Sequence, residues 1–384
     1  MSKYIKERFL DFSPYTPGEQ PAIKNLIKLN TNESPYPPGP RVIAALKKGT
    51  MEGLRLYPSP DQSLLKGKLA EAYSEYLPGL SRENVFVSNG SDDILNFAFL
   101  AYTSEGKGAV YPDISYGFYK VFAEFQGVNK IEIKLRDDFT ISPDDYKPEN
   151  YMNKIEGKGD VGLVVLANPN APTGIALGFD QVEEIIKSNR DKVVLIDEAY
   201  VDFGGETVLP LIEKYDNLIV SRTYSKSASL AGARLGFAFG NKELMKDLEV
   251  VKYSTNPYSV NSMTELTGLA VLEEAEYYRE NQRKIIETRE WTKDKLEALG
   301  LKVLPSKANF LFVGTGKEAS GNEWKDISGE ELQSWLKERG ILVRWFNKER
   351  IKDYLRITIG KREDMEVLVK ELKEKGEGRS KTNV

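Results

Sequence analysis

A lysine stands among small and hydroxyl-bearing residues in the segment 221–236, SRTYSKSASLAGARLG, which follows an apolar run. A lysine in a closed, partly apolar site loses its proton readily, so Lys226 could condense there with a carbonyl group. Arg234 offers a planar fork suited to a phosphate, and Ser225 and Thr223 add hydroxyl donors. A surface lysine beside a flexible loop is the alternative interpretation.

A carboxylate follows another apolar run, in the segment 193–200, VVLIDEAY. This places Asp197 at the carboxyl end of a buried strand, where ligands of open α/β sheets gather. An acid at that position could pair with a protonated pyridine nitrogen, and the cationic ring could then accept the electron pair released when a substrate Cα–H bond breaks. Alternatively, Asp197 caps a following helix or turn.

Two turns follow further apolar runs. In the segment 85–94, VFVSNGSDDI, a strand breaks at Gly90 and a helix begins at Ser91 and Asp92, whose free backbone N–H groups could bind a phosphate. A simple helix cap is the alternative for this segment. The segment 166–174, LANPNAPTG, is by itself only a turn rich in Pro, Asn and Gly.

Short apolar runs alternate with longer helical patterns between residues 85 and 239, which is typical of an α/β domain with a mostly parallel central sheet flanked by helices. Helical spacing of apolar residues continues over 242–252 and over a long stretch from 263 to 299. The expected strands are 85–87, 109–111, 161–167, 193–196, 218–220 and 236–239.

A second, smaller α+β unit follows. Its expected elements are strands at 310–313, 341–343 and 355–359 and helices near 330–339 and at 362–374. The first residues are rich in Pro, Asn and Gly and predict an extended arm. We therefore expect an N-terminal arm over 1–45 that packs with the small domain, a large domain over 46–280, a small domain over 281–375 and a disordered tail over 376–384.

The composition excludes several kinds of chemistry. The chain of 384 residues contains no cysteine and no histidine, which rules out disulfides, thiol nucleophiles, His-based triads and nearly every common zinc site. Acid–base chemistry must therefore depend on Lys, Asp, Glu or Tyr, and we expect no metal. A biased composition and an engineered sequence would each account for the missing histidines.

Charge and hydropathy narrow the range of partners. The net charge of −4 gives no general attraction for nucleic acid. No apolar run approaches the roughly 20 residues needed to span a bilayer. We expect a cytoplasmic protein that binds small molecules.

Together these segments resemble, in kind and in order, the motifs of the fold-type I pyridoxal-5′-phosphate (PLP) aminotransferases of class II. The four motifs are Gly-Ser-Asp at 90–92, N-P-x-x-P-T-G at 168–174, D-E-A-Y at 197–200, and S-K followed by A-G-x-R-x-G over 225–236. The resemblance covers nearly the whole chain. It is closest to the histidinol-phosphate aminotransferase family, through the segments 14–15, 29–33, 56–58, 343–344 and 355–358.

The resemblance implies a transaminase of histidine biosynthesis that uses PLP and exchanges an amino group between L-histidinol phosphate and 2-oxoglutarate. Lys226 would form the Schiff base with PLP and later shuttle a proton. Asp197 would bind the pyridine nitrogen, and Tyr200 would donate a hydrogen bond to the ring O3′. Tyr116 would stack on the ring, with a core position as the alternative.

The resemblance also implies a phosphate site, a substrate site and a homodimer. Tyr57 would reach the cofactor phosphate of the neighbouring subunit. Arg356, assisted by Arg344, would bind the carboxylate of glutamate or the phosphate of histidinol phosphate, and an exposed salt bridge is the alternative for both. The residues expected at the phosphate are Gly90, Ser91, Asp92, Thr223, Ser225 and Arg234. Those expected at the substrate are Tyr15, Asn32, Glu33, Arg344 and Arg356.

One position departs from the family pattern. Many relatives have Asn immediately before P-T-G, where its amide contacts O3′, whereas Ala171 stands there and the nearest amide is that of Asn170. Either Asn170 takes that contact or Tyr200 makes it alone. A threonine-phosphate decarboxylase or an aromatic aminotransferase could use the same arrangement, and a non-catalytic PLP-sensing domain is the alternative of another class.

Overall fold

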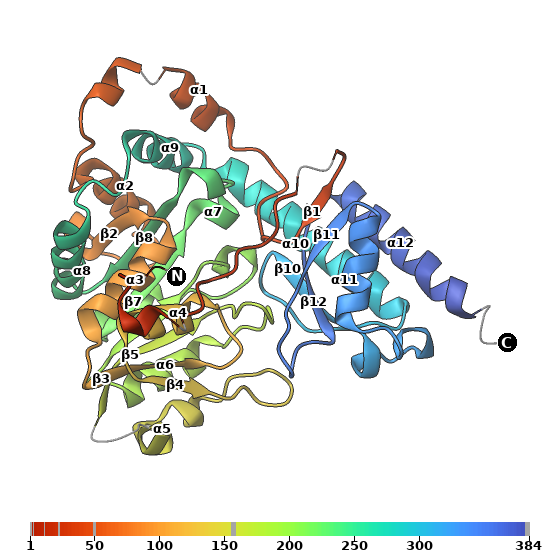
Figure 1. The fold of residues 1–384 in the computed structure, drawn as a ribbon. Helices are drawn as coiled ribbons and strands as arrows, with labels where there is room; N and C mark the ends of the chain where they lie inside the picture. The colour runs from red at the N-terminus through yellow and green to blue at the C-terminus, as the bar shows by residue number, and fades with distance from the viewer. Residues whose placement is uncertain are drawn as a thin grey trace.

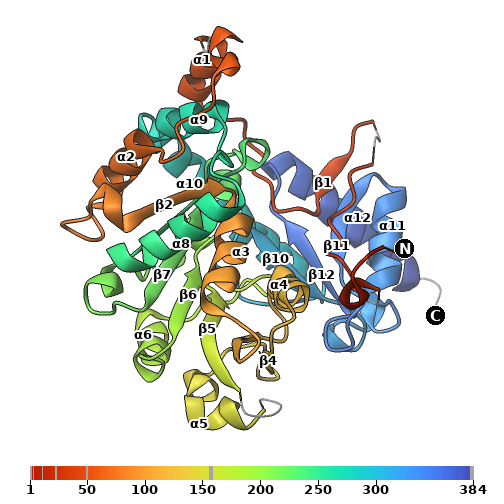
Figure 2. The ribbon, with the colours of Figure 1, turned by 60° about the vertical axis from the view of Figure 1, so that its left-hand side comes forward.

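The structure, a computed structural model, describes residues 2, 4–10, 12–21, 24–48, 51–154 and 159–380. Two β-sheets organise these residues, one of seven strands and one of five. In Figure 1 the larger sheet and its helices lie on the left and the smaller sheet lies on the right, and the red N-terminal segment runs between them. The view in Figure 2 shows the same two parts from another side.

The seven-stranded sheet is parallel except for one strand. Its strands are β2 (Val85–Asn89), β3 (Lys107–Pro112), β4 (Lys130–Ile133), β5 (Asp160–Ala167), β6 (Val193–Asp197), β7 (Leu218–Thr223) and β8 (Leu235–Gly240). They lie in the order β2-β8-β7-β6-β5-β3-β4. β8 runs antiparallel to both of its neighbours, and the other neighbouring pairs are parallel. The mostly parallel sheet expected from the sequence is confirmed.

Helices cover both faces of this sheet, because successive side chains of a strand point to opposite faces. Val85 and Val87 belong to one buried cluster, whereas Phe86 between them belongs to another. The first cluster includes side chains of α2 (Ser63–Tyr73), α6 (Phe179–Ser188) and α9 (Ser262–Leu272). The second includes side chains of α3 (Ser91–Tyr102), α4 (Phe118–Gln126) and α8 (Lys242–Thr255). Burial on both faces explains the nearly continuous apolar runs of the strands.

The five-stranded sheet joins the start of the chain to its end. It consists of β1 (Ile27–Leu29), β9 (Lys302–Val303), β10 (Phe310–Gly314), β11 (Ile341–Trp345) and β12 (Tyr354–Thr358), in the order β1-β11-β12-β10-β9. β1 pairs in parallel with β11, so the N-terminal arm is part of this sheet. The helices α10 (Ala275–Ala298), α11 (Gly329–Glu338) and α12 (Arg362–Ser380) complete this part.

Several expected elements have different bounds. The helix expected from 263 to 299 is two helices, because α9 ends at Leu272 and α10 begins at Ala275. The tail expected to fray from residue 376 continues α12 as far as Ser380, and residues 381–384 lie outside the described residues. The arm is not extended throughout, since a 3-10 turn covers Glu7–Phe9 and α1 (Pro40–Lys48) begins at Pro40.

Short helices occupy the remaining connections. They are α1 (Pro40–Lys48), α5 (Pro148–Tyr151) and α7 (Tyr224–Ser227). Among the described residues, no helix combines the length and the apolar character that crossing a membrane requires. α10 spans residue 280, where a domain boundary was expected, and the division into arm, large domain and small domain stays a prediction.

Candidate active site

Asp197 is a buried acid at the end of a strand of the larger sheet. It ends β6, where it lies opposite Ser221 of β7, and 5% of it is exposed. One carboxylate oxygen accepts a hydrogen bond from Ser221 Oγ (3.0 Å) and the other from the Tyr119 hydroxyl (3.2 Å). No lysine or arginine among the described residues forms an ion pair with it. Burial raises the pKa of Asp197 to about 6, although both hydroxyl donors lower it.

Glu198, the next residue, has the opposite surroundings. Its carboxylate pairs with Arg222 Nε (3.2 Å) and accepts hydrogen bonds from Thr207 Oγ1 and Val208 N, each at 2.7 Å. Arg222 also pairs with Asp202 (3.2 Å) and donates to the Tyr73 hydroxyl (3.3 Å). We refer to Glu198, Asp202, Arg222 and Tyr73 as the Arg222 cluster. Its charges already have partners.

Lys226 lies in α7, directly after β7. Thr223 is the N-cap residue of this helix, and its Oγ1 accepts a hydrogen bond from Ser225 N (3.1 Å). The Lys226 amine donates to the backbone carbonyl of Thr31 in the arm (3.3 Å). Burial, together with repulsion from the Arg356 guanidinium, lowers the pKa of Lys226 to about 8. An amine with this pKa is a much better nucleophile near neutral pH than an ordinary lysine.

A cradle for a phosphate forms where the start of α3 meets Arg234. Gly90 precedes α3 with a φ of 85°, and no intrachain acceptor is present for the backbone N–H groups of Ser91 and Asp92 among the described residues. A Cβ on Gly90 would lie 2.4 Å from Arg234 Nη2, and a Cβ on Gly236 would lie 2.4 Å from Ser91 N. Any side chain at either glycine would therefore fill the cradle.

Arg234 is held at this cradle by Asp92 and Ser225. Its Nη2 pairs with Asp92 Oδ2 at 3.0 Å, and its Nη1 lies 3.4 Å from Ser225 Oγ. Ser225 Oγ in turn accepts a hydrogen bond from Thr223 Oγ1 (2.9 Å). The structure thus brings together the six residues expected around a phosphate.

Aromatic residues lie beside the cradle. The Tyr116 hydroxyl donates to Asp92 Oδ1 (2.7 Å), and burial followed by the Asp92 charge raises its pKa well above the usual range. Tyr15 of the arm stacks on Phe118 with ring centroids 4.2 Å apart, and its ring lies 6.2 Å from that of Tyr116. Burial also raises the pKa of Tyr15, against the opposing effect of Arg356. Both tyrosines therefore stay neutral donors.

The arm contacts the end of the D-E-A-Y segment through Asn32. Asn32 Nδ2 donates to the Tyr200 hydroxyl (3.0 Å), while Asn309 Nδ2 and the Thr358 hydroxyl donate to Asn32 O and Oδ1, each at 3.0 Å. The φ of Asn32 is 57°, a left-handed conformation that Asn tolerates. Tyr200 keeps its own O–H for a ligand, because it accepts the Asn32 bond.

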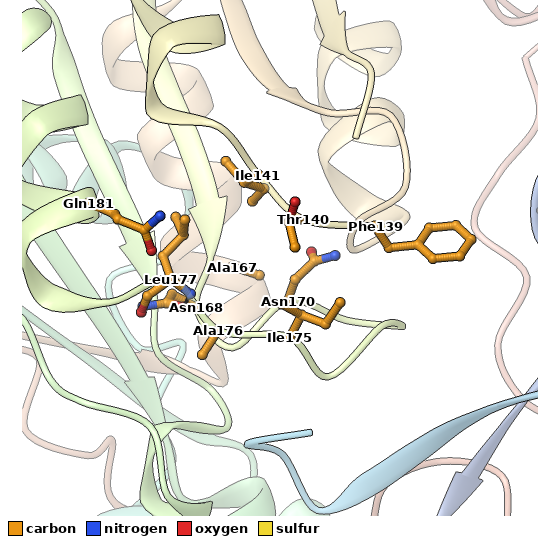
Figure 3. Close-up of a pocket in the computed structure, with 10 residues that line it drawn as sticks. All are labelled: Phe139, Thr140, Ile141, Ala167, Asn168, Asn170, Ile175, Ala176, Leu177 and Gln181. Carbon is orange, nitrogen blue, oxygen red and sulfur yellow. Dashed lines mark hydrogen bonds between the residues drawn. The ribbon is translucent and has the colours of Figure 1, made fainter. Parts of the chain in front are cut away.

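Asn170 is fully engaged within its own loop. Its amide donates to Ile114 O and to Thr173 Oγ1, each at 3.0 Å, and its oxygen accepts from Ser115 Oγ (2.8 Å). Asn170 lines a small cavity of about 70 Å³, and Lys226 is not among its lining residues. Figure 3 shows these residues. In this arrangement the amide has no free N–H for a ligand.

Two arginines lie opposite each other in the smaller sheet, where Arg344 of β11 pairs in register with Arg356 of β12. Arg356 Nη2 donates to Asn30 O (2.9 Å), and its Nε is buried without a partner. Burial lowers the pKa of Arg356 from its ordinary value. Arg344 donates to Thr16 O (3.1 Å) and Pro17 O (3.3 Å) in the arm. Neither arginine forms a salt bridge within the described residues, so an anion can still bind between them.

Glu33 and Tyr57 have other surroundings than the remaining expected residues. Glu33 is paired with Lys28 and accepts from Thr31 Oγ1 (2.7 Å). Tyr57 is 81% exposed and stacks on Tyr258 at 4.5 Å. In the isolated chain Tyr57 therefore points into solvent rather than packing into the core.

Sequence reasoning missed two donors to Asp197. Tyr119 lies in the first turn of α4, three residues after Tyr116, which precedes that helix. Ser221 precedes Thr223 by two residues, and this spacing places both on one face of β7. These spacings were readable, but the sequence contains no signal that β7 lies beside β6.

Comparison with known proteins identifies the family of this chain. The family model for aminotransferase class I and II matches residues 24–372. The chain belongs to this family. A histidinol-phosphate aminotransferase of Brachyspira hyodysenteriae is 45% identical to it over 374 residues, which cover 97% of this chain and 99% of that relative. One of Acinetobacter baylyi is 46% identical over 366 residues, or 94% of each chain.

A solved structure shares the fold of this aminotransferase. Histidinol-phosphate aminotransferase from Sinorhizobium meliloti, solved in complex with pyridoxal-5′-phosphate, has a TM-score of 0.77 and 22% identity, and the match covers 92% of this chain and 91% of that chain. Together with the family match, this confirms the fold class and the resemblance expected from the sequence.

Proposed function

We propose that this aminotransferase is a histidinol-phosphate aminotransferase, which uses PLP to exchange the amino group between L-histidinol phosphate and 2-oxoglutarate. The observation that carries the proposal is Asp197, a buried carboxylate with two neutral hydrogen-bond donors and no cation among the described residues. A buried charge without a partner is costly, so such a site is suited to a ligand that brings a positive N–H.

The residues around Asp197 fit PLP. Asp197 would hold the ring nitrogen, the cradle at Gly90 and Arg234 would hold the phosphate, and the Lys226 amine would hold the aldehyde carbon. When bound, PLP supplies an electron sink for the electron pair of the broken substrate bond. The O–H of Tyr200 is free to donate to the ring oxygen, and this supports Tyr200 rather than Asn170 as the donor there.

Lys226 would carry the reacting proton. Once its amine is free, Nζ would take the proton from the substrate Cα and return it to the carbon of the cofactor that carried the aldehyde. A pKa near 8 suits this exchange, because the amine then gains and loses a proton with little cost near neutral pH. Tyr116 would stack on the ring beside Asp92.

The two arginines support an anionic substrate. The unpaired Nε of Arg356 and its register with Arg344 offer a fork for the carboxylate of glutamate or the phosphate of histidinol phosphate. Tyr15 would border the same space from the arm, and Asn32 would position Tyr200. Glu33 would affect a substrate only through its negative charge, because its carboxylate is already paired with Lys28.

The proposal includes a homodimer in which Tyr57 reaches the phosphate cradle of the second copy. Its support is the exposure of large apolar side chains close together in the sequence, since Leu54, Leu56 and Tyr57 are 56%, 59% and 81% exposed. Tyr57 is also the kind of side chain that can donate to a phosphate oxygen. A cytoplasmic location belongs to the proposal as well.

A two-stage assay tests this function. The PLP-loaded protein is incubated with glutamate and freed of small molecules, and then imidazole-acetol phosphate is added alone. We expect one equivalent of 2-oxoglutarate in the first stage and L-histidinol phosphate in the second, as in a ping-pong reaction. Transfer to aromatic oxo acids but not to imidazole-acetol phosphate would indicate an aromatic aminotransferase. Release of CO₂ from a phosphorylated amino acid would indicate a decarboxylase.

A further inference from the structure

A buried lysine outside the active site holds the loop that carries Tyr57. Lys252 of α8 is fully buried, and its Nζ donates to Pro60 O (3.0 Å) and to Gln62 Oε1 (2.6 Å). Both acceptors are in the short connection between Tyr57 and α2. The same lysine lies over the ring of Phe86, 5.7 Å from its centroid.

This position is costly for an ammonium group. Lys252 forms no salt bridge within the described residues, and Glu249 in the same helix is paired with Lys66. Burial lowers the pKa of Lys252 to about 8. A charged amine buried against two neutral acceptors adds little net stability compared with an apolar side chain, so stability alone does not explain it.

The loop that Lys252 contacts is fixed along its whole length. Asp61 Oδ1 accepts a hydrogen bond from Ser59 Oγ (2.7 Å), and Asp61 also accepts from the Ser63 hydroxyl. Gln62 is fully buried, has a φ of 45°, and donates to Ser59 O. A left-handed conformation at a buried glutamine persists only where its surroundings hold it.

The end of α8 supports the same loop a second time. Tyr258 follows α8 and stacks on Tyr57, with ring planes 20° apart. The two contacts lie on either side of Pro58, one at the Tyr57 ring and one at Pro60 and Gln62. They leave the Tyr57 residue 81% exposed.

We propose that Lys252 is a positioning residue that acts on the second subunit's active site, by fixing the loop 58–62 so that Tyr57 reaches the neighbouring phosphate cradle. This inference rests on the proposed homodimer and on the proposed role of Tyr57. It predicts that removing the Lys252 amine weakens cofactor binding in the neighbouring subunit, not in the subunit that carries the change.

A double-mutant cycle tests the connection between Lys252 and Tyr57. In Lys252→Met, and separately in Tyr57→Phe, we expect the dissociation constant for PLP to rise about tenfold. This is the effect expected from the loss of one hydrogen bond to a phosphate. The double variant should be no weaker than Tyr57→Phe alone, because both changes remove the same contact. Lys192→Met is the control, since this lysine is also buried but pairs with the adjacent Asp191, far in sequence from Tyr57, and it should leave the constant unchanged.

Hybrid dimers decide which subunit is affected. In one hybrid a single chain carries both Lys226→Ala and Lys252→Met and its partner is wild type, so the one intact Lys226 faces the altered loop. There we expect the tenfold weakening. When Lys252→Met is moved to the chain with the intact Lys226, binding should return to the wild-type value. The reverse pattern, or equal weakening in both hybrids, would overturn the inference.

The outcomes separate this inference from the function on which it rests. Normal PLP binding by Tyr57→Phe would overturn both the role of Tyr57 and that of Lys252. Weakened binding by Tyr57→Phe together with normal binding by Lys252→Met would overturn the role of Lys252 alone. If Lys252→Met does not fold, Gln62→Met replaces it, because that change removes an acceptor of the same amine.

Discussion

Asp197 and Glu198 are consecutive buried acids with opposite surroundings. Glu198 belongs to the Arg222 cluster, where each charged group has an ionic partner. Asp197 lies at the carboxyl edge of the sheet with two hydroxyl donors and no cation within the described residues. The first arrangement stabilises the fold, whereas the second leaves the Asp197 carboxylate without an internal cation. We therefore expect Glu198 to act as a structural acid and Asp197 as a binding acid.

Two buried lysines differ in the same way, by the presence or absence of an ionic partner. Lys192 is buried and paired with Asp191, whereas the Lys226 amine contacts only a backbone carbonyl among the described residues. The comparison predicts that changes at the unpaired groups reduce activity and leave stability unchanged or higher, whereas changes in the Arg222 cluster reduce stability first. Four experiments test this contrast.

The largest effect is expected for Lys226→Ala. Activity should fall by about 10⁴-fold or more, because the change removes both the nucleophile and the proton carrier. The free energy of unfolding of the cofactor-free protein should not fall, since no ion pair is lost. Steady-state transamination and urea unfolding measure the two quantities. Substantial residual transamination would remove Lys226 from the mechanism.

Arg222→Met tests the other half of the comparison. It leaves Glu198 buried without a cation, so we expect a loss of about 3–5 kcal/mol in the free energy of unfolding, with kcat of the folded fraction close to wild type. Arg279→Met is the control, because that side chain is 59% exposed and should change stability by less than about 0.5 kcal/mol. A stable Arg222→Met protein without activity would reverse the assignment of the cluster.

Asp197→Asn should lower activity by about 10²–10³-fold while the cofactor-free protein becomes more stable. Burial raises the pKa of Asp197 to about 6, so the folded state holds this proton more tightly than the unfolded state, whose carboxyl has a pKa of about 3.9. Wild type should therefore lose stability, by about 3 kcal/mol at most, as the pH rises from about 4 through 6. Urea unfolding at pH 5 and pH 7.5 should show the two proteins diverging at the higher pH. Parallel curves would contradict the raised pKa.

The smallest effect concerns the pH dependence of PLP capture. Only the neutral amine attacks the aldehyde, so the rate should rise about tenfold per pH unit up to about pH 8 and then level off. An ordinary lysine would keep rising to about pH 10.4. Stopped-flow absorbance measures the rate. Arg356→Met should move the plateau to higher pH, because the Arg356 charge helps to lower the pKa of Lys226.

The residues that could do chemistry at the ends of the strands could be predicted from the sequence. The spacing of Lys226 and Arg234, the acid at the end of β6 and the glycine before α3 were readable, because each depends on a strand that ends in a turn or a helix start. The alternation of apolar runs likewise determined the α/β class. It did not determine the break between α9 and α10 or the continuation of α12, since helical periodicity persists through short interruptions.

Which side chains contact each other depends on the tertiary structure and could not be predicted from the sequence. The arm reaches Tyr200 through Asn32 and Lys226 through the Thr31 carbonyl, and Arg356 meets the Asn30 carbonyl, across more than 160 residues of sequence in each case. Likewise, nothing in D-E-A-Y distinguishes an acid with an arginine partner from one without. Local propensity determines strands and caps, whereas the neighbours of a buried charge depend on how the strands are ordered and how both faces of the sheet are packed.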